Sequence, residues 1–323
     1  MTINIDKIPK DFTIGYYLSK SKLDKLKWVQ FVELAKNKYN IKCVPIDIDS
    51  KDYPEKCPYD IIVHKLTDEL SNPLKKENVS TVESIQSLVK HYPKLLQVDP
   101  LDNQKPVVDR NVLSNLLHRL NQLPEELNIK NPQFVVINEK QDSYQSILNE
   151  NNIHFPVVCK PIQACGSTES HFMGIVFKEQ DLHNFSLPLL VQQYVNHDSM
   201  IYKVFVIGDY LHVVHRKSMR NMDPNEKECI TFDSQKPFPD SLLDPLFDGK
   251  PLNEPKLDIL NIVSKDIQKN LGLSLFGFDV IVDSTTKKMA VVDVNYFPTY
   301  GGVQDFFSIL LDHIIYTYQK NNM

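Results

Sequence analysis

Two aspartates and an asparagine late in the sequence have the types and spacing of a metal site. Asp279 lies in the run FGFDVIV, and Asp293 and Asn295 lie in the following run MAVVDVN. The alternation of side chains in these runs has the period of two half-buried strands joined by a polar turn. A turn centred near Thr286 would place Asp279 opposite Asp293, with Asn295 two residues on and on the same face.

Opposed aspartates call for a counter-charge. Like charges directly opposite each other destabilise a sheet, whereas a divalent cation between them removes that penalty. Carboxylate and amide oxygens are ligands that Mg²⁺ prefers, so Asp279, Asp293 and Asn295 form a candidate magnesium site. The alternative is an exposed hairpin with two solvated aspartates. The apolar residues that flank the aspartates, together with Asn295, favour the metal site.

A lysine and a glycine-containing loop in mid-chain have features of a phosphate-binding site. Lys160 lies in the strand-like run FPVVCKPI and is followed by the small polar loop 163–170, which contains Gly166. An ammonium group and backbone N–H groups can surround nucleotide phosphates, although a surface hairpin with a Gly turn fits the same residues. The sequence contains no GxxxxGK[ST], GxGxxG, HRD or DFG motif, which argues against P-loop, Rossmann and protein-kinase enzymes.

Composition and charge narrow the class of protein. The chain has 323 residues, of which 42% are hydrophobic and 24% charged, as in a soluble globular protein with two or three domains. The net charge of −5 argues against nonspecific nucleic-acid binding. No apolar run is long enough for a membrane span, and no secretory signal is visible. The five cysteines, which include Cys57, form no CxxC pair and favour reduced thiols. We therefore expect a cytoplasmic monomer with no nucleic-acid or membrane partner.

The periodicity predicts an α/β unit followed by two α+β lobes. The N-terminal α/β domain is expected over 1–107, with strands at 12–18, 41–48 and 60–66, a helix at 23–39, and a proline-interrupted crossing segment at 91–107. A central lobe is expected over 108–191, with helices at 112–120 and 143–151 and strands at 132–137, 155–162 and 171–177. A C-terminal lobe is expected over 192–323, with long hairpins from 200 onward and helices at 255–271 and 305–319. A strand at 188–195 would join the two lobes.

Six short motifs connect these units to a known family. They are GYYLSKSK from Gly15, HKLTD from His64, Asp109-Arg110, CGSTESH from Cys165, QQYVNH from Gln192 and DVNYFPTYGGV from Asp293. Together they resemble the inositol 1,3,4-trisphosphate 5/6-kinase family, which includes inositol-tetrakisphosphate 1-kinases. The order of lysine strand, loop, linking strand and late metal hairpin is also similar to that of ATP-grasp enzymes. The resemblance implies an ATP-grasp fold with the nucleotide between two α+β lobes.

The resemblance also implies an activity and its site residues. The activity is Mg²⁺-dependent transfer of the ATP γ-phosphoryl group to a free hydroxyl of an inositol polyphosphate: position 5 or 6 of inositol 1,3,4-trisphosphate, or position 1 of inositol 3,4,5,6-tetrakisphosphate. Two Mg²⁺ ions are expected on the three hairpin residues. The positions matched to ATP contacts are Arg110, Lys160, Gln192, Gln193, Tyr194, Val195, Lys203, Ser218 and Ser234. Those matched to inositol-phosphate contacts are Lys22, Lys65, His171, Lys203, Asn295 and Gly301. No residue is matched to a general base.

Two other functions fit some of these residues. An ATP-grasp ligase would activate a carboxylate as an acyl phosphate for attack by an amine, but Asp293 stands where many such ligases have a glutamate. A non-catalytic inositol-phosphate-binding module would bind the sugar without transfer, but it has no need of the aspartate pair. One serine expected from the resemblance has no counterpart after Ser234, where Gln-Lys-Pro-Phe follows.

Overall fold

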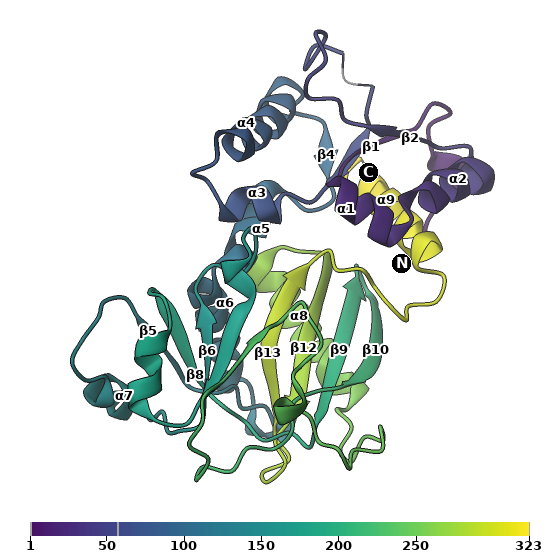
Figure 1. The fold of residues 1–323 in the computed structure, drawn as a ribbon. Helices are drawn as coiled ribbons and strands as arrows, with labels where there is room; N and C mark the ends of the chain where they lie inside the picture. The colour runs from purple at the N-terminus through teal and green to yellow at the C-terminus, as the bar shows by residue number, and fades with distance from the viewer. Residues whose placement is uncertain (1, 57, 323) are drawn as a thin grey trace.

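Three β-sheets with helices packed on them make up the computed structural model, which describes residues 2–56 and 58–322 (Figure 1). Cys57 lies outside the described residues, and the four other cysteines are free thiols. Short 3-10 helices lie in the segments before and between the larger elements. Five of them are η1 (Ile5–Lys7), η3 (Arg119–Gln122), η4 (Glu125–Leu127), η6 (Glu179–Asn184) and η7 (Asp240–Leu242).

The N-terminal sheet is parallel, with the strand order β2-β1-β3-β4. Its strands are β1 (Thr13–Tyr17), β2 (Lys42–Pro45), β3 (Ile61–His64) and β4 (Leu96–Gln97). All four residues of β3 are buried, because helices cover both faces of a parallel sheet. The covering helices from this part of the chain are α1 (Lys20–Leu26), α2 (Trp28–Tyr39), α3 (Thr67–Ser71) and α4 (Lys76–His91). The predicted helix at 23–39 is thus two helices, and α4 was not predicted.

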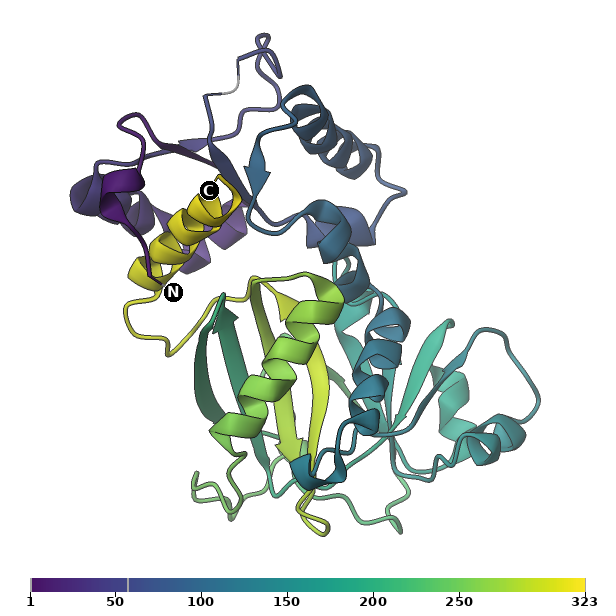
Figure 2. The ribbon, with the colours of Figure 1, turned by 180° about the vertical axis from the view of Figure 1, so that it is seen from behind.

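The last helix, α9 (Phe306–Asn321), returns to this N-terminal unit and packs against α2 (Figures 1 and 2). The rings of Phe307 and Phe31 lie 5.9 Å apart, and those of Phe12 and Tyr318 lie 4.7 Å apart. The predicted domain limits stay predictions, but the C-terminal segment clearly contributes a helix to the N-terminal core.

A helical connection leads from the N-terminal unit to the central sheet. It consists of α5 (Leu101–Gln104), η2 (Lys105–Val108) and α6 (Arg110–His118). The central sheet has the order β11-β7-β6-β8-β5 and is antiparallel at every pairing. Its strands are β5 (Phe134–Ile137), β6 (Val157–Pro161), β7 (Phe172–Val176), β8 (Leu189–Gln193) and β11 (Ile230–Asp233). The connections between them include α7 (Gln145–Glu150) and η5 (Glu169–His171). Strand β11, which returns from beyond the linking segment to pair with β7, was not predicted.

The C-terminal sheet is also antiparallel, with the order β10-β9-β12-β13. Its elements are β9 (Met200–Ile207), β10 (Tyr210–Lys217), α8 (Leu257–Leu271), β12 (Leu275–Val282) and β13 (Met289–Tyr296). Helix α8 lies across the back of this sheet (Figure 2), and its buried side chains join a core that also includes β9, β12 and α9. One continuous core therefore links the C-terminal sheet to the N-terminal unit.

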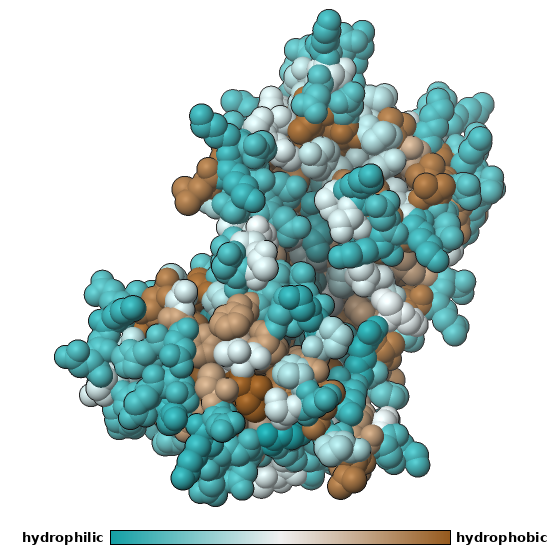
Figure 3. Space-filling model, viewed as in Figure 1, coloured by the Kyte–Doolittle hydropathy of each residue, from teal (hydrophilic) through white to brown (hydrophobic). Residues whose placement is uncertain are grey.

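The surface is mostly hydrophilic, with apolar side chains gathered between the two lower lobes and a hollow below the N-terminal unit (Figure 3). None of the helices in the described ranges combines the length and apolar character needed to cross a bilayer.

Candidate functional site

The β12–β13 hairpin pairs Asp279 with Asp293, which confirms the predicted register at this point. A bulge follows, because the register shifts between Asp279 and Val280. On its other side, Asp279 is paired with Lys203 of β9, whose Nζ lies 2.7 Å from the carboxylate. Asn295 donates its Nδ2 to Asp293 Oδ2 at 2.8 Å. A row of polar and charged side chains thus crosses β9, β12 and β13.

The aspartate pair suits a divalent cation. The Asp279 side chain is only 15% exposed; burial raises its pKa, Lys203 opposes that rise, and Asp293 adds to it. No cluster of three or more His, Cys, Asp or Glu side chains suited to a metal occurs in the described part of the chain. Since Mg²⁺ commonly binds one or two carboxylates and completes its shell with water and phosphate oxygens, these residues fit an ion shared with a phosphorylated ligand.

Two basic residues of the central lobe face the aspartates. Lys160 on β6 donates to Gln192 Oε1 at 2.8 Å. Burial lowers the pKa of Lys160 to about 8, while Asp293 and Asp279 oppose the lowering. Arg110, at the start of α6, is also buried, and Asp293 is the first group that opposes the resulting fall in its pKa. Both cations therefore lie within the electrostatic reach of the hairpin.

Arg110 also organises the loop that follows β6. Its Nη1 donates to the carbonyls of Pro161 and Gln163 at 2.8 Å and to that of Ser170 at 3.1 Å. Gly166 in this loop has φ +86°, and a Cβ there would lie 2.9 Å from the Asp68 carbonyl, so the close turn requires glycine. The loop is thereby held against α3 of the N-terminal unit.

The strand that links the lobes is fixed by local hydrogen bonds. Tyr194 donates its hydroxyl to the Arg220 carbonyl at 2.7 Å, and the Gln193 amide donates to the Pro156 carbonyl at 3.2 Å. The Val195 carbonyl lies 2.7 Å from His197 Nδ1, and His197 Nε2 lies 2.9 Å from Ser218 Oγ. Because the carbonyl can only accept, Nδ1 must carry the proton and Nε2 accepts from the Ser218 hydroxyl. Ser218 is therefore tied to the linking segment.

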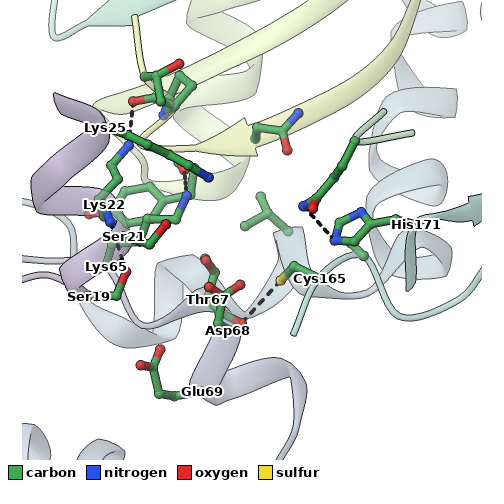
Figure 4. A pocket seen from close by; sticks show the side chains of 17 residues that line it. Ser19, Ser21, Lys22, Lys25, Lys65, Thr67, Asp68, Glu69, Cys165 and His171 are labelled. Atoms are coloured by element: carbon green, nitrogen blue, oxygen red, sulfur yellow. Dashed lines mark hydrogen bonds between the residues drawn. The ribbon is translucent and has the colours of Figure 1, made fainter. Parts of the chain in front are cut away.

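A cavity of about 280 Å³ lies between the N-terminal unit and the two lobes (Figure 4). Four of the residues matched to inositol-phosphate contacts line it: Lys22, Lys65, His171 and Asn295. Lys22 and Lys65 come from one wall and His171 from the opposite wall (Figure 4). The other two matched positions, Lys203 and Gly301, are not among its lining residues. The Gly301 carbonyl accepts from Arg216 Nη2 at 3.3 Å.

The two wall lysines hold the segment that follows β13. Lys22 Nζ donates to the carbonyls of Phe297 and Pro298, the latter at 2.7 Å, and lies 4.6 Å from the centre of the Phe297 ring. Lys65 Nζ donates to the Tyr296 carbonyl at 2.9 Å. Burial, helped by Lys65 and Lys25, lowers the pKa of Lys22 to about 6, and burial also lowers the pKa of Lys65. Such poorly solvated amines would gain most from a polyanionic ligand.

Sequence reasoning missed much of the cavity lining. The further lining residues are Ser19, Ser21, Lys25, Thr67, Asp68, Glu69, Val107, Ala164, Cys165, Gln235, Tyr296, Pro298 and Thr299. Most lie within four residues of Lys22, Lys65 or Asn295 in the sequence, so their closeness to these matched residues could have indicated them. Gln235 is different, because only the pairing of β11 with β7 brings it to the cavity.

Comparisons with known proteins agree with this arrangement. The family model for the inositol 1,3,4-trisphosphate 5/6-kinase ATP-grasp domain matches residues 124–316, and that for the pre-ATP-grasp domain of the same kinase matches residues 13–103. Inositol-tetrakisphosphate 1-kinase of Danio rerio is 35% identical over 315 residues, covering 93% of this chain and 78% of its own length. The Xenopus laevis protein of that name is 33% identical over 316 residues, covering 95% and 79%.

Solved structures support the fold. D-alanine–D-alanine ligase from Bacillus anthracis complexed with ATP has a TM-score of 0.58 at 17% identity, covering 97% of this chain and 98% of that chain. A RimK-domain ATP-grasp protein from Sphaerobacter thermophilus has a TM-score of 0.55 at 13% identity, covering 95% and 99%. These likenesses identify the ATP-grasp fold, and the matches along the sequence show that the chain belongs to the inositol 1,3,4-trisphosphate 5/6-kinase family.

Proposed function

We propose that this chain is a Mg²⁺-dependent kinase that transfers the γ-phosphoryl group of ATP to a hydroxyl of an inositol polyphosphate. The proposed substrates are inositol 1,3,4-trisphosphate, at position 5 or 6, and inositol 3,4,5,6-tetrakisphosphate, at position 1. The observation that carries the proposal is a cavity with cationic walls that reaches Asn295, two residues from the Asp279–Asp293 pair. A cytoplasmic location and a monomeric state stay predictions.

The cavity suits a sugar that carries several phosphates. Lys22, Lys65 and His171 would contact phosphate groups from two sides, and the hydroxyls of Ser21 and Thr67 would hydrogen-bond to the ring substituents. A polyanion supplies acceptors that can replace the backbone carbonyls now bonded to Lys22 and Lys65. Negative charge beside the two amines would raise both of their lowered pKa values.

The nucleotide is proposed to lie between the central and C-terminal lobes. Gln192, Gln193, Tyr194 and Val195 would hold the base through the linking strand, with Ser218 and Ser234 at its border. Lys160 and Lys203 would contact phosphate oxygens, since both ammonium groups lie near enough to Asp279 to lower the pKa of its carboxyl group. When bound to Asp279, Asp293 and Asn295, Mg²⁺ would supply neutralisation of phosphate charge.

The protein would contribute to the reaction mainly by aligning the two substrates. Phosphoryl transfer has a loose transition state, so positioning and charge neutralisation matter more than a strong base. The inositol oxygen forms a bond to the γ-phosphorus as the bond to the bridging oxygen of ADP breaks, and the hydroxyl proton leaves to solvent or phosphate. Lys65 and His171 would orient the sugar, and Lys160 and Lys203 would hold the transferred group.

A product assay tests the proposal. Purified protein is incubated with MgATP and a panel of inositol tris- and tetrakisphosphates, and the ring position of each new phosphate is assigned. A new phosphate at position 5 or 6 of the 1,3,4-trisphosphate is expected. Amino-acid-dependent ADP release with a new amide would instead establish a ligase. Tight inositol-phosphate binding without ATP consumption would establish a non-catalytic binding module.

Asp293→Asn tests the metal residues. The substitution keeps the shape and removes one of the two opposed charges, so turnover should fall by about 100-fold or more while the fold is kept. The measurement is kcat at saturating MgATP, with circular dichroism and the unfolding temperature as checks. Asp283→Asn, in the turn of the same hairpin, is the matched control and should retain wild-type turnover. Near-normal kcat in folded Asp293→Asn protein would rule out the metal assignment.

A further inference from the structure

Gln235 lies two residues after the end of β11, on the side of the cavity that His171 occupies. Asp233, the last residue of β11, is paired with Phe172 of β7. This pairing lets the Ser234 backbone N–H donate to the His171 carbonyl at 2.9 Å. Gln235 and His171 both line the cavity. The pairing of two strands far apart in sequence therefore fixes the position of Gln235 relative to His171.

The side chains of Gln235 and His171 are hydrogen-bonded to each other. Gln235 Nε2 lies 2.9 Å from His171 Nε2, a contact drawn as a dashed line in Figure 4. An amide NH₂ can only donate, so His171 Nε2 must be the unprotonated nitrogen and the ring proton must lie on Nδ1. Ser234 Oγ, 3.5 Å from Nδ1, is on the side where that proton would point. The contacts thus select one tautomer of neutral His171.

The charges around His171 also favour the neutral ring in the free protein. Burial and the guanidinium of Arg110 lower its pKa, whereas Asp233 and Asp68 act in the opposite direction. These groups come from α6, α3 and the residue that ends β11. Lys236 Nζ lies 3.2 Å from the Asp233 carboxylate, and this ion pair weakens the effect of Asp233 on the ring. Phosphate groups entering the cavity would add negative charge beside the ring and favour the imidazolium. The partner of Nε2 then decides how readily that change occurs.

We propose that Gln235 is a positioning residue for inositol-phosphate binding: it holds His171 in its Nδ1–H form, with the ring directed into the cavity, and thereby sets the pH dependence of substrate binding. The proposal rests on the proposed function for its link to substrate. Its structural part, the tautomer and orientation of His171, does not depend on any activity.

The first test is a nitrogen-15 NMR titration of histidine in the free protein, with His171 assigned through the loss of its signals in His171→Asn. Wild-type protein should show His171 with Nε2 unprotonated. In Gln235→Leu, which removes the donor but keeps the bulk, His171 should shift toward the Nε2–H tautomer. In Gln235→Glu, the new carboxylate should raise the His171 titration midpoint by about one unit or more. Lys227→Gln, at an exposed position in the loop before β11, should leave the His171 tautomer unchanged.

The second test is the pH profile of KM for the inositol phosphate. In Gln235→Leu, KM should rise by about tenfold, because the substrate loses one hydrogen bond from an oriented group. The change in kcat should be smaller. In Gln235→Glu, the pH above which KM rises should move upward with the His171 midpoint. Lys227→Gln should retain the wild-type profile.

The two tests can be contradicted independently of each other. An unchanged His171 tautomer in Gln235→Leu would overturn the positioning role even if the wild-type protein is an active kinase. An altered tautomer with an unchanged KM profile would overturn the link to substrate. Wild-type protein without kinase activity would refute the proposed function, and the NMR result would still decide whether Gln235 sets the state of His171.

Discussion

Lys22 is a basic side chain that the free protein holds at a cost in stability. Lys22 is 8% exposed, and its Nζ is partnered by backbone carbonyls and one aromatic ring rather than by a carboxylate. Its pKa falls from an ordinary 10.5 to about 6. Between these values the unfolded chain binds a proton that the folded protein does not, so Lys22 lowers stability at neutral pH, and this cost shrinks as the pH rises toward 10.5.

Lys22→Met should therefore separate stability from binding. The apolar side chain keeps the contact with Phe297 and removes the buried amine, so the folded protein should gain about 1 kcal/mol or more at pH 7. KM for the inositol phosphate should rise by about tenfold or more, since one phosphate contact is lost. Urea denaturation and the product assay measure the two effects.

Lys20→Met is the control for this prediction, because Lys20 is exposed on the same helix and lies outside the cavity lining. It should change neither quantity appreciably. A Lys22→Met protein that is less stable than wild type would show that the carbonyl contacts outweigh the cost of burying the amine.

Whether a contact between two site residues can be predicted from the sequence depends on how the fold positions each residue. Asp279 and Asp293 could be placed opposite each other because strand period and turn position fix a hairpin register. The bulge after Asp279 could not be predicted, since no Gly or Pro marks it. Gln235 could not be connected to His171 either, because their contact depends on a strand pairing between distant segments that local pattern does not encode.

At the scale of elements, the break between α1 and α2 is the clearest departure from the predicted helix. The apolar period continues through it, with Leu26 and Trp28 both buried. Lys27 nevertheless has φ 57° and ψ 50°, and its N–H caps α1 by donating to the carbonyls of Asp24 and Leu23. A left-handed residue at a helix end is usually Gly or Asn, so a lysine gave no signal.

Lys27→Gly should stabilise the protein by about 1 kcal/mol, because glycine adopts the left-handed conformation without the steric penalty of a Cβ. The urea midpoint measures the gain. The matched control is Lys36→Gly, an exposed position within α2, where glycine should cost about 1 kcal/mol. Destabilisation by both substitutions would mean that the Lys27 side chain makes a compensating contact.

Helix α4 was missed for a different reason. Only Ile85 and Leu88 of its sixteen residues are buried, so the apolar stripe that would reveal a helix is short. Helix α4 continues to His91, the first residue of the predicted crossing segment at 91–107, and the rest of that segment contains β4, α5 and most of η2. A helix with so few buried side chains is held by a small number of core contacts, and these contacts leave too weak an apolar pattern in the sequence to predict the helix.

At the scale of the whole molecule, one buried polar cluster joins three parts of the chain. Asp99, just after β4, accepts from the Ser274 N–H at 2.7 Å, the Ser274 hydroxyl at 2.9 Å and the Leu275 N–H at 2.9 Å. His313 of α9 lies 2.7 Å from the same hydroxyl. Because the hydroxyl donates to Asp99, it accepts from His313 Nε2–H. The N-terminal unit, the C-terminal sheet and α9 therefore share this cluster.

His313→Gln should change the acid dependence of unfolding. Burial lowers the pKa of His313 from 6.5 to about 4, so the unfolded chain takes up a proton first as the pH falls, and His313 costs stability between pH 6.5 and 4. Gln can still donate to Ser274 but does not titrate. Relative to wild type, the variant should gain about 3 kcal/mol on going from pH 7 to pH 4.

The comparison with wild type isolates His313 from Asp99, whose pKa is raised by burial to about 7 and whose effect on stability has the opposite slope over this range. Urea midpoints at several pH values measure the difference. His91→Gln, on the surface of α4, should show the wild-type pH dependence. A His313→Gln protein with that same dependence would refute the prediction.

The return of α9 to the N-terminal unit has a consequence for biosynthesis. Trp28 and Phe31 depend on Phe307 of α9 for part of their packing, yet they precede that partner by 279 and 276 residues of chain. At a synthesis rate of about 5–20 residues per second, the aromatic face of α2 stays uncovered for about 15–55 s after it leaves the ribosome. The first domain to be translated is thus among the last to be completed, and during that interval its aromatic face is available to chaperones.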